Sequence, residues 1–238
     1  MSAHRGDNGC GYVGDGRAED VVRWALDRFH PRIAIAASLQ DAALIHMARQ
    51  IHPEARVFSL DTGRLPEETY EFAEEIRRQL GVSIEWHFPR QDAVEKLETG
   101  KGLFSFKNSL EDRRECCRIR KVEPLGRALQ GLQAWITGLR RDESVTRVGL
   151  DKIEKDEAHG GRLKINPLAD WTLQDIRDYS RRHRLPVHPL LDRGYPSIGC
   201  ACCTRAVAEG EDARAGRWWW ERPEHKECGL HTDSRKQG

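Results

Sequence analysis

The sequence lacks any apolar stretch long enough to span a membrane, since no run of 18 apolar residues occurs in its 238 positions. Its first 16 residues, MSAHRGDNGCGYVGDG, contain no apolar segment typical of a secretory signal. It also lacks an excess of either charge, because 39 Lys and Arg residues nearly balance 38 Asp and Glu residues, for a net charge of +1. Nucleic-acid binders usually carry a basic excess. We therefore expect a cytoplasmic protein with neither a membrane nor a nucleic acid as partner.

Aromatic residues are also scarce, at 7%, while charged residues reach 32%, and neither an internal repeat nor a low-complexity tract occurs. The length is enough for one α/β domain with a full core. We expect three parts: a flexible N-terminal arm over 1–16, the domain itself over 17–206, and a polar C-terminal tail over 207–238 that contains Trp218, Trp219 and Trp220.

Short apolar runs alternate with segments of helical periodicity along the first 140 residues. The expected helices cover 18–29, 41–51 and 66–80, and the expected strands cover 32–38, 56–60, 82–88 and 134–138. A further helix should begin after Thr172, with Asp175 completing a capping box. Strands that alternate with helices favour a doubly wound, mostly parallel sheet.

Three loops that follow the expected strands carry groups able to hold a phosphate or a ribose, namely 38–41, 61–64 and 138–141. In doubly wound sheets, ligands bind beyond the carboxyl ends of the strands. Any one of these loops could simply be a strand-to-helix turn, since Ser, Asp and Gly are common there. Three in order favour a nucleotide site.

The cysteines are unevenly distributed: Cys116 and Cys117 are adjacent, and Cys200 and Cys203 form a C-x-x-C pair. Four thiolates suit a structural zinc ion or a cubane iron–sulfur cluster. Adjacent cysteines do not form a zinc knuckle, because successive side chains diverge, yet they can reach two irons of a cubane. The spacing favours a [4Fe–4S] cluster and leaves zinc as an alternative.

Three other cysteines stand apart from these four. Cys202 lies inside the C-x-x-C pair and could compete as a ligand, and Cys10 lies in the polar N-terminal arm. Cys228 is a lone thiol in the polar tail, three residues before His231. A solvated cysteine with no packing role is a candidate reactive thiol.

Six segments together resemble the assimilatory adenylylsulfate reductases, the cluster-containing branch of the phosphoadenylylsulfate reductase family. They are CCRIRKVEPL (116–125), TGLRRDESVTR (137–147), KINPLADWT (164–172), YPSIGCACCTR (195–205), GEDARAGRWWWE (210–221) and ECGLH (227–231). The resemblance covers most of the chain in the family's order, and its double cysteine, C-x-x-C pair and terminal ECGLH form a specific combination. Cys202 is a departure, since the family usually has proline there.

The resemblance implies the fold of the adenine-nucleotide α-hydrolase-like proteins, with a modified pyrophosphate loop at SLQDA, 38–42. This loop departs from the S-G-G-x-D-S pattern of relatives that cleave ATP. The resemblance further implies one [4Fe–4S] cluster on Cys116, Cys117, Cys200 and Cys203, with 17–206 as the nucleotide-binding and iron–sulfur reductase domain and 207–238 as the catalytic tail.

The implied reaction is the reduction of adenosine 5′-phosphosulfate to sulfite and AMP. The Cys228 thiolate attacks the sulfate sulfur and becomes an S-sulfocysteine, from which reduced thioredoxin or a similar dithiol donor releases sulfite. The residues that the resemblance places around the substrate are Ser38, Gln40, Leu60, Thr62, Gly63, Lys121, Arg141, Arg147, Arg214, Arg217 and His231. Arginines suit this task because their planar fork holds two oxygens at once.

Other readings of the sequence stay open. A tRNA-thiolating enzyme of the same fold class would need the S-G-G-x-D-S loop and usually a basic surface, and this sequence has neither. A zinc-binding interaction module, which would not be an enzyme, would contain zinc in place of iron and sulfide. A reductase that also accepts the 3′-phosphorylated nucleotide, 3′-phosphoadenylylsulfate, is the third alternative.

Overall fold

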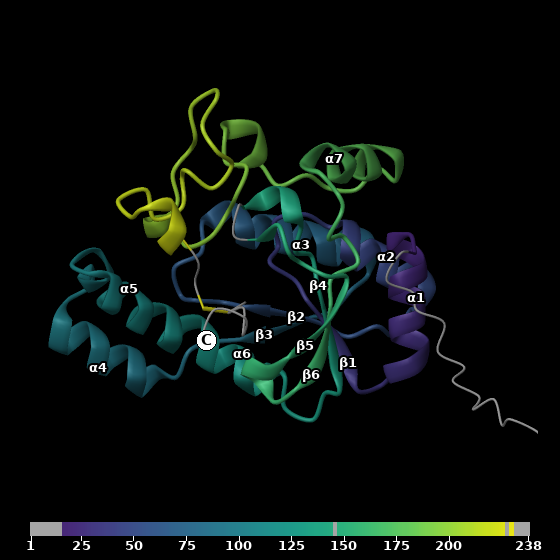
Figure 1. The fold of residues 1–238 in the computed structure, drawn as a ribbon, viewed down its shortest axis with the longest axis horizontal. Coiled ribbons are helices and arrows are strands. Elements are labelled where there is room, and N and C mark those ends of the chain that lie inside the picture. Colours follow the sequence, from purple (N-terminus) through teal and green to yellow (C-terminus); the bar gives the residue numbers. More distant parts are fainter. Residues whose placement is uncertain (1–15, 145–146, 227–228, 231–238) are drawn as a thin grey trace, which may run out of the picture.

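The computed structural model describes residues 16–144, 147–226 and 229–230, and within these ranges one six-stranded sheet forms the centre of the molecule (Figure 1). The strands are β1 (Ile33–Ala36), β2 (Val57–Leu60), β3 (Ile84–His87), β4 (Ala134–Thr137), β5 (Ile153–Asp156) and β6 (Arg162–Ile165). Their order is β3-β2-β1-β4-β6-β5. All neighbours are parallel except β5, which pairs antiparallel with β6. The prediction of a doubly wound, mostly parallel sheet is confirmed.

The helices follow from the same alternation. They are α1 (Ala18–Phe29), α2 (Ala43–Ile51), α3 (Glu67–Leu80), α4 (Gln91–Lys101), α5 (Leu110–Cys117), α6 (Glu123–Ala128) and α7 (Leu173–Arg182). Helix α3 ends at Gly81, which adopts a left-handed conformation with φ of 59°, as glycine does after many helices. Helix α7 begins with the expected capping box, in which Thr172 and Asp175 bind each other's backbone N–H groups.

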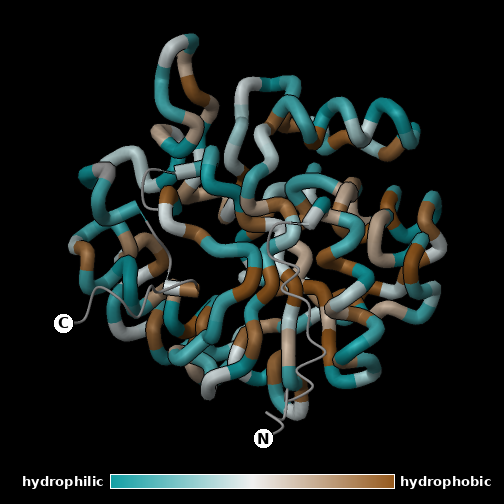
Figure 2. Tube along the Cα trace, turned by 45° about the vertical axis from the view of Figure 1, so that its right-hand side comes forward, coloured by the Kyte–Doolittle hydropathy of each residue, from teal (hydrophilic) through white to brown (hydrophobic). Residues whose placement is uncertain are grey.

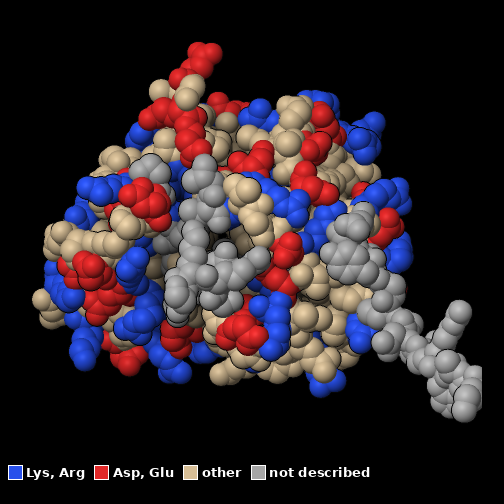
Figure 3. Space-filling view, viewed as in Figure 1, with Lys and Arg blue, Asp and Glu red and all other residues tan. Residues whose placement is uncertain are grey.

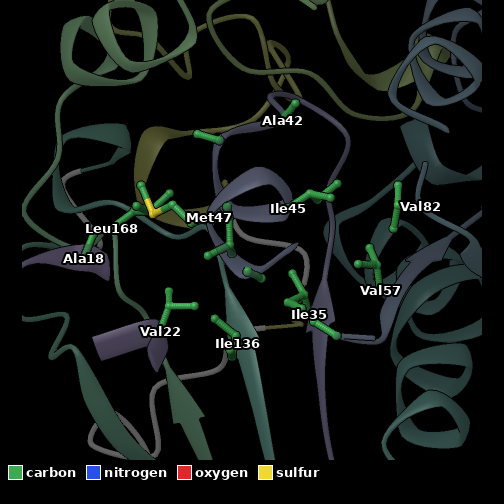
Figure 4. Packing of buried hydrophobic residues seen from close by; sticks show 14 of the residues in the cluster. Ala18, Val22, Ile35, Ala42, Ile45, Met47, Val57, Val82, Ile136 and Leu168 are labelled. Atoms are coloured by element: carbon green, nitrogen blue, oxygen red, sulfur yellow. The ribbon is translucent and has the colours of Figure 1, made fainter. Parts of the chain in front are cut away.

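One face of the sheet carries the main apolar core. Side chains alternate between the two faces of a strand, so Ile33 and Ile35 of β1 point to one face together with Ile136 of β4. There they pack against apolar residues of α1, α2, α3 and α7. Figure 4 shows part of this packing, with Val22, Ile45 and Met47 among the labelled side chains. Figure 2 shows apolar residues on the sheet strands and polar residues on the outer turns of the helices.

The opposite face is covered differently. Ala34, Phe58 and Trp135 point to this face and pack against Leu125 and Leu129, at and just beyond α6. Helices α4 and α5 lie away from the sheet, on the side of the molecule opposite α1 and α2 (Figure 1).

The first part of the C-terminal tail packs back onto the domain. Arg205 N donates to Gly216 O at 3.0 Å, and Trp218 N donates to Cys203 O at 3.1 Å. Trp218 is completely buried. The division at residue 206 remains a prediction, but residues 207–226 share contacts with the domain rather than extending from it.

Charges of both signs are mixed on the surface. Lys and Arg side chains are interspersed with Asp and Glu over the face shown in Figure 3, with no large area of one sign. Within the described ranges, no helix is both long enough and apolar enough to cross a bilayer.

Candidate functional site: a nucleotide cavity beside a cysteine cavity

A cavity opens where the strand order reverses between β1 and β4, the place where doubly wound sheets bind ligands. Its walls come from the ends of β1, β2 and β4 and the loops that follow them, including Ser38, Thr62 and Gly138. Lys121, Arg214 and other residues from later in the chain close it from the side. We call it the substrate cavity.

The substrate cavity has two chemically different ends. Phe58, Leu125, Trp135 and Leu230 give it an apolar end on the α6 face. Lys121, Arg214 and Arg217 surround the ring of Trp218 and give the cavity a cationic end, and all three are less than a tenth exposed. The partly buried Arg147 also lines the cavity and pairs with Glu143. Such a cavity suits a molecule with a flat apolar base at one end and anionic groups at the other.

Most of the residues predicted to bind substrate line this cavity. They are Ser38, Gln40, Leu60, Thr62, Lys121, Arg147, Arg214 and Arg217. Gly63 and Arg141 are not among the lining residues, and Arg141 Nε instead donates to Leu150 O at 2.8 Å. His231 lies outside the described residues.

Two of the lining residues also hold the walls together. The Gln40 side chain donates to Pro196 O at 3.1 Å and accepts from Ile198 N at 3.2 Å, so it fixes the segment before Cys200 to the loop after β1. Thr62 Oγ1 lies 3.3 Å from Cys200 Sγ. Thr62 therefore contacts a cysteine as well as the substrate cavity.

A second, smaller cavity holds the cysteines. Cys116, Cys117, Cys200, Cys202 and Cys203 all line it, although they come from segments more than 80 residues apart. Cys200, Lys121 and Trp218 line both this cysteine cavity and the substrate cavity, so the two are neighbours. Among the described residues, no three His, Cys, Asp or Glu side chains form a group able to hold a single metal ion.

The adjacent cysteines lie at the end of α5, and the chain continues directly into a π-helical turn, Arg118–Val122. A π turn inserts an extra residue into a helix and often occurs at functional sites. It places Lys121 on the wall between the two cavities. The sequence predicted Lys121 four residues beyond Cys117 on one helix face, and the structure adds the π turn.

Trp218 is the residue that the sequence did not single out for this site. Its ring is surrounded by cations, with Arg113 Cζ at 4.7 Å and Arg217 Cζ at 4.8 Å from the ring centroid and Lys121 Nζ at 5.7 Å. Its φ of 39° is unfavourable for a residue with a side chain. The run of three tryptophans in a polar tail was the available signal.

Two buried carboxylates fix the cations that face the cysteines. Glu98 Oε1 accepts from Arg64 and from Arg120, at 2.6 Å each. Glu221 forms a two-bond pair with Arg113, with both distances at 2.9 Å. The three arginines and Lys121 all line the cysteine cavity, so four cations stand against two carboxylates, which leaves an environment suited to an anion.

Several buried N–H groups at these cavities lack an acceptor within the part of the chain that the structure describes: Arg120 Nε, Arg217 Nε and Trp218 Nε1. Buried donors are nearly always hydrogen-bonded in folded proteins. Their positions call for acceptors such as the sulfurs of a cluster or the oxygens of an anionic substrate. The donor set of four cysteines around one cavity and the surplus of cations both fit a [4Fe–4S] cluster.

The thiols around the cysteine cavity differ in acidity. Burial raises the pKa of Cys116 to about 11, and the neighbouring thiols Cys117 and Cys200 add to this effect. The hydrogen bond between Cys202 and Cys203 lowers the pKa of Cys202 to about 6 and raises that of Cys203. Binding of a metal to such buried thiols would release their protons.

The residues on both sides of position 228 lie at the substrate cavity. Arg214 Nη2 donates to Lys226 O at 2.6 Å. Leu230 lines the cavity, and Gly229 lies against Val122. Cys228 itself lies outside the described residues.

Comparison with known proteins agrees with this geometry. Residues 30–206 match the family model of the phosphoadenosine phosphosulfate reductase domain. The chain belongs to this family. It is 52% identical to the adenosine 5′-phosphosulfate reductase of Allochromatium vinosum, over 84% of this chain and 78% of that protein. It is 50% identical to the enzyme of the same name from Burkholderia cepacia, over 89% of this chain and 85% of that protein.

Solved structures support the fold. The phosphoadenylyl-sulfate reductase of Candida auris, solved as a phosphate complex, superposes with a TM-score of 0.67 at 25% identity, covering 81% of this chain and 91% of that one. The FMN adenylyltransferase of Candida glabrata has a TM-score of 0.53 at 15% identity, over 77% of this chain and 62% of that one, which indicates a shared fold alone. The predicted adenine-nucleotide α-hydrolase-like fold is confirmed.

Proposed function

We propose that this protein reduces adenosine 5′-phosphosulfate to sulfite and AMP in assimilatory sulfate reduction. The observation that carries the proposal is the two-ended substrate cavity, whose cationic end adjoins a cavity lined by five cysteines. The relatives named adenosine 5′-phosphosulfate reductase support the same substrate.

The substrate would bind with its adenine at the apolar end and its phosphosulfate at the cationic end. Lys121, Arg214 and Arg217 are buried, so their bonds to the sulfate and phosphate oxygens would be little weakened by water. The same cations would stabilise the charge that develops on AMP as it leaves. Arg147 and the loop containing Ser38 would hold the phosphate from the other side.

The nucleophile in this proposal is the thiolate of Cys228. It attacks the sulfate sulfur, the S–O bond to AMP breaks, and an S-sulfocysteine forms. A thiolate of thioredoxin, or of a similar dithiol protein, then attacks the Cys228 sulfur and expels sulfite. The second thiol of the donor resolves the mixed disulfide, which oxidises the donor and restores Cys228 as a thiolate. His231 is proposed to stabilise the Cys228 thiolate or the sulfate.

We further propose that Cys116, Cys117, Cys200 and Cys203 hold one [4Fe–4S] cluster. When bound, it would supply fixed charge and sulfur acceptors beside Lys121 rather than electrons for the reaction. The proposed compartment is the cytoplasm, because none of the five cysteines of the described chain is in a disulfide, as is usual for cysteines under reducing conditions.

The test is a single turnover without a reductant. Reduced enzyme mixed with adenosine 5′-phosphosulfate should release about one AMP per chain and carry a sulfonate adduct on the peptide that contains Cys228. Cys228→Ser should bind the nucleotide but form no adduct. Normal turnover by this variant, or an adduct on Cys10 or Cys202, would show that another residue is the nucleophile. Parallel assays with the 3′-phosphorylated nucleotide decide whether both substrates are accepted.

A further inference from the structure

Large apolar side chains lie exposed next to the cysteine cavity. Leu103 is 63% exposed, Phe104 is 61% exposed and Trp219 is 41% exposed. Lys107 Nζ joins three aromatic rings into one surface, since it lies 5.6 Å from the ring centroid of Phe104, 5.8 Å from that of Trp219 and 5.6 Å from that of Trp220. Leu103 directly precedes Phe104 in the chain. We call these five residues the Phe104 patch.

The base of the Phe104 patch is held in place by residues of the cysteine cavity. Arg64 Nη2 donates to Leu103 O at 2.6 Å. The buried ring of Phe106 lies 6.0 Å from Phe104 and 6.1 Å from Trp220 between centroids. Arg64 and Phe106 both line the cysteine cavity, so the exposed rings stand on a fixed support.

The chain connects this patch to the substrate cavity. From Trp219 it runs through Glu221 and His225, both of which bind Arg113. It then reaches Lys226, whose carbonyl oxygen is held by Arg214 at the wall of the substrate cavity. Position 228 follows two residues later, so a protein seated on the patch would contact the beginning of the chain segment that leads to the proposed nucleophile.

The occupant should be a protein that supplies its own apolar surface. The two ends of this chain do not, because residues 231–238 read HTDSRKQG and residues 1–15 are mostly polar or glycine. Attack on the sulfur of an S-sulfocysteine needs a thiolate brought directly against that sulfur. Redox encounters between proteins use small interfaces, and a few exposed aromatic rings with one lysine are enough for such a contact.

We propose that the Phe104 patch is the docking surface for the dithiol protein that releases sulfite from Cys228. The inference rests on the proposed function, since it assigns a place to the second half of that reaction. The first half, in which AMP leaves, needs no partner protein. The two halves can therefore be measured separately.

The experiment uses full-length enzyme carrying Phe104→Ser, and separately Leu103→Ser, with Val187→Ser as the control. Val187 is 51% exposed and precedes His188, which contacts Phe72 and Thr69 of α3 rather than residues of the patch. Each variant is loaded with adenosine 5′-phosphosulfate, and release of sulfite is then followed with thioredoxin or with excess dithiothreitol. The patch variants should raise the KM for thioredoxin roughly tenfold, as expected for loss of one central apolar contact. Their AMP release, iron content and reaction with dithiothreitol should match those of the unmodified enzyme.

The results separate the two proposals. Absence of AMP release from the unmodified enzyme would refute the proposed function, whatever the patch does. Normal thioredoxin kinetics in both patch variants would refute the docking surface alone. Equal slowing with dithiothreitol would also refute it, because the substitutions would then act on the cysteine segment itself. If the unmodified enzyme were a dimer and the patch variants were monomers, the patch would be a contact between copies of this chain, and the inference would be overturned. Phe104→Leu keeps an apolar side chain, so its KM for thioredoxin should be close to that of the unmodified enzyme.

Discussion

The sheet half and the cysteine half of the molecule are built on opposite principles. In the sheet half, Ile33, Ile35 and Ile136 are buried among other aliphatic side chains and need no other partner. In the cysteine half, Arg113 and Arg120 are buried almost as deeply, beside thiols and an aromatic ring. Buried charge is unfavourable unless it is paired. The comparison teaches that one half is stabilised by its own apolar packing, whereas the other buries arginines paired with Glu98 and Glu221 and, in the function proposed above, is completed by a bound anion.

Loss of a proposed cluster ligand should have the largest effect, and this effect should be confined to the cysteine half. Cys117→Ser should remove the iron and abolish turnover, because one of four thiolates is lost from the cysteine cavity. Cys202→Ser is the matched control and should keep both iron and activity. Hydrogen exchange should show loss of protection at 105–122 and 197–226, with β1 and β4 still protected. Full iron content in Cys117→Ser would remove this residue from the ligand set.

Removal of a cation at the substrate cavity should have the next largest effect. Arg217→Ala should weaken binding of adenosine 5′-phosphosulfate by about 1.5–3 kcal/mol, the range for a hydrogen bond to a charged group. Binding of AMP should change less, since AMP has no sulfate. Arg205→Ala is the control, because Arg205 lies in a partly exposed pair with Glu211. Isothermal titration of both nucleotides measures the difference, and equal losses for the two would place Arg217 away from the sulfate.

Glu98→Gln should have a smaller effect, confined to the cysteine half. It weakens the acceptor shared by Arg64 and Arg120, so the cavity wall should loosen and chelators should remove iron faster. Glu95→Gln, on the same helix with an exposed partner at Gln91, should leave the rate unchanged. Identical iron-release rates in the two variants would mean that Glu98 has no role in holding the cluster.

A substitution in the sheet half should have the smallest effect on the site. Ile45→Val removes one methylene from the aliphatic core, where Ile45 is buried. It should lower the free energy of unfolding by about 0.5–1.5 kcal/mol. Iron content and KM should stay unchanged, as measured by denaturant unfolding and steady-state kinetics. Loss of iron from this variant would show that the halves are coupled more tightly than their packing indicates.

The same contrast explains which parts of the fold were predictable. The apolar runs of β1, β2, β3 and β4 identified these strands to within two residues at each end. Strands β5 and β6 were missed because IEKD has a single apolar residue and RLKI has as many polar as apolar residues. In such strands, pairing with a neighbouring strand decides the structure more than the local pattern does.

The residues of the site were predictable where they belong to a recognisable sequence motif. The cysteines and the arginines of the tail follow from spacing and resemblance, and most of the predicted residues meet at one cavity. Glu98 and the π turn at Arg118–Val122 leave no local signature. Their importance comes from which segments the fold brings together. Gly199 likewise has no local signature, and its importance comes from the fold, since a side chain at this position would overlap the guanidinium of Arg217.

The central claim is that an anionic iron–sulfur cluster completes the cysteine half, and the most direct test is the metal content of the full chain. Protein purified without oxygen should contain about four irons and four acid-labile sulfides per chain and should be brown. Its loss of iron to a chelator should coincide with loss of reduction of adenosine 5′-phosphosulfate. One zinc per chain, without visible absorbance and with full reductase activity, would contradict the account.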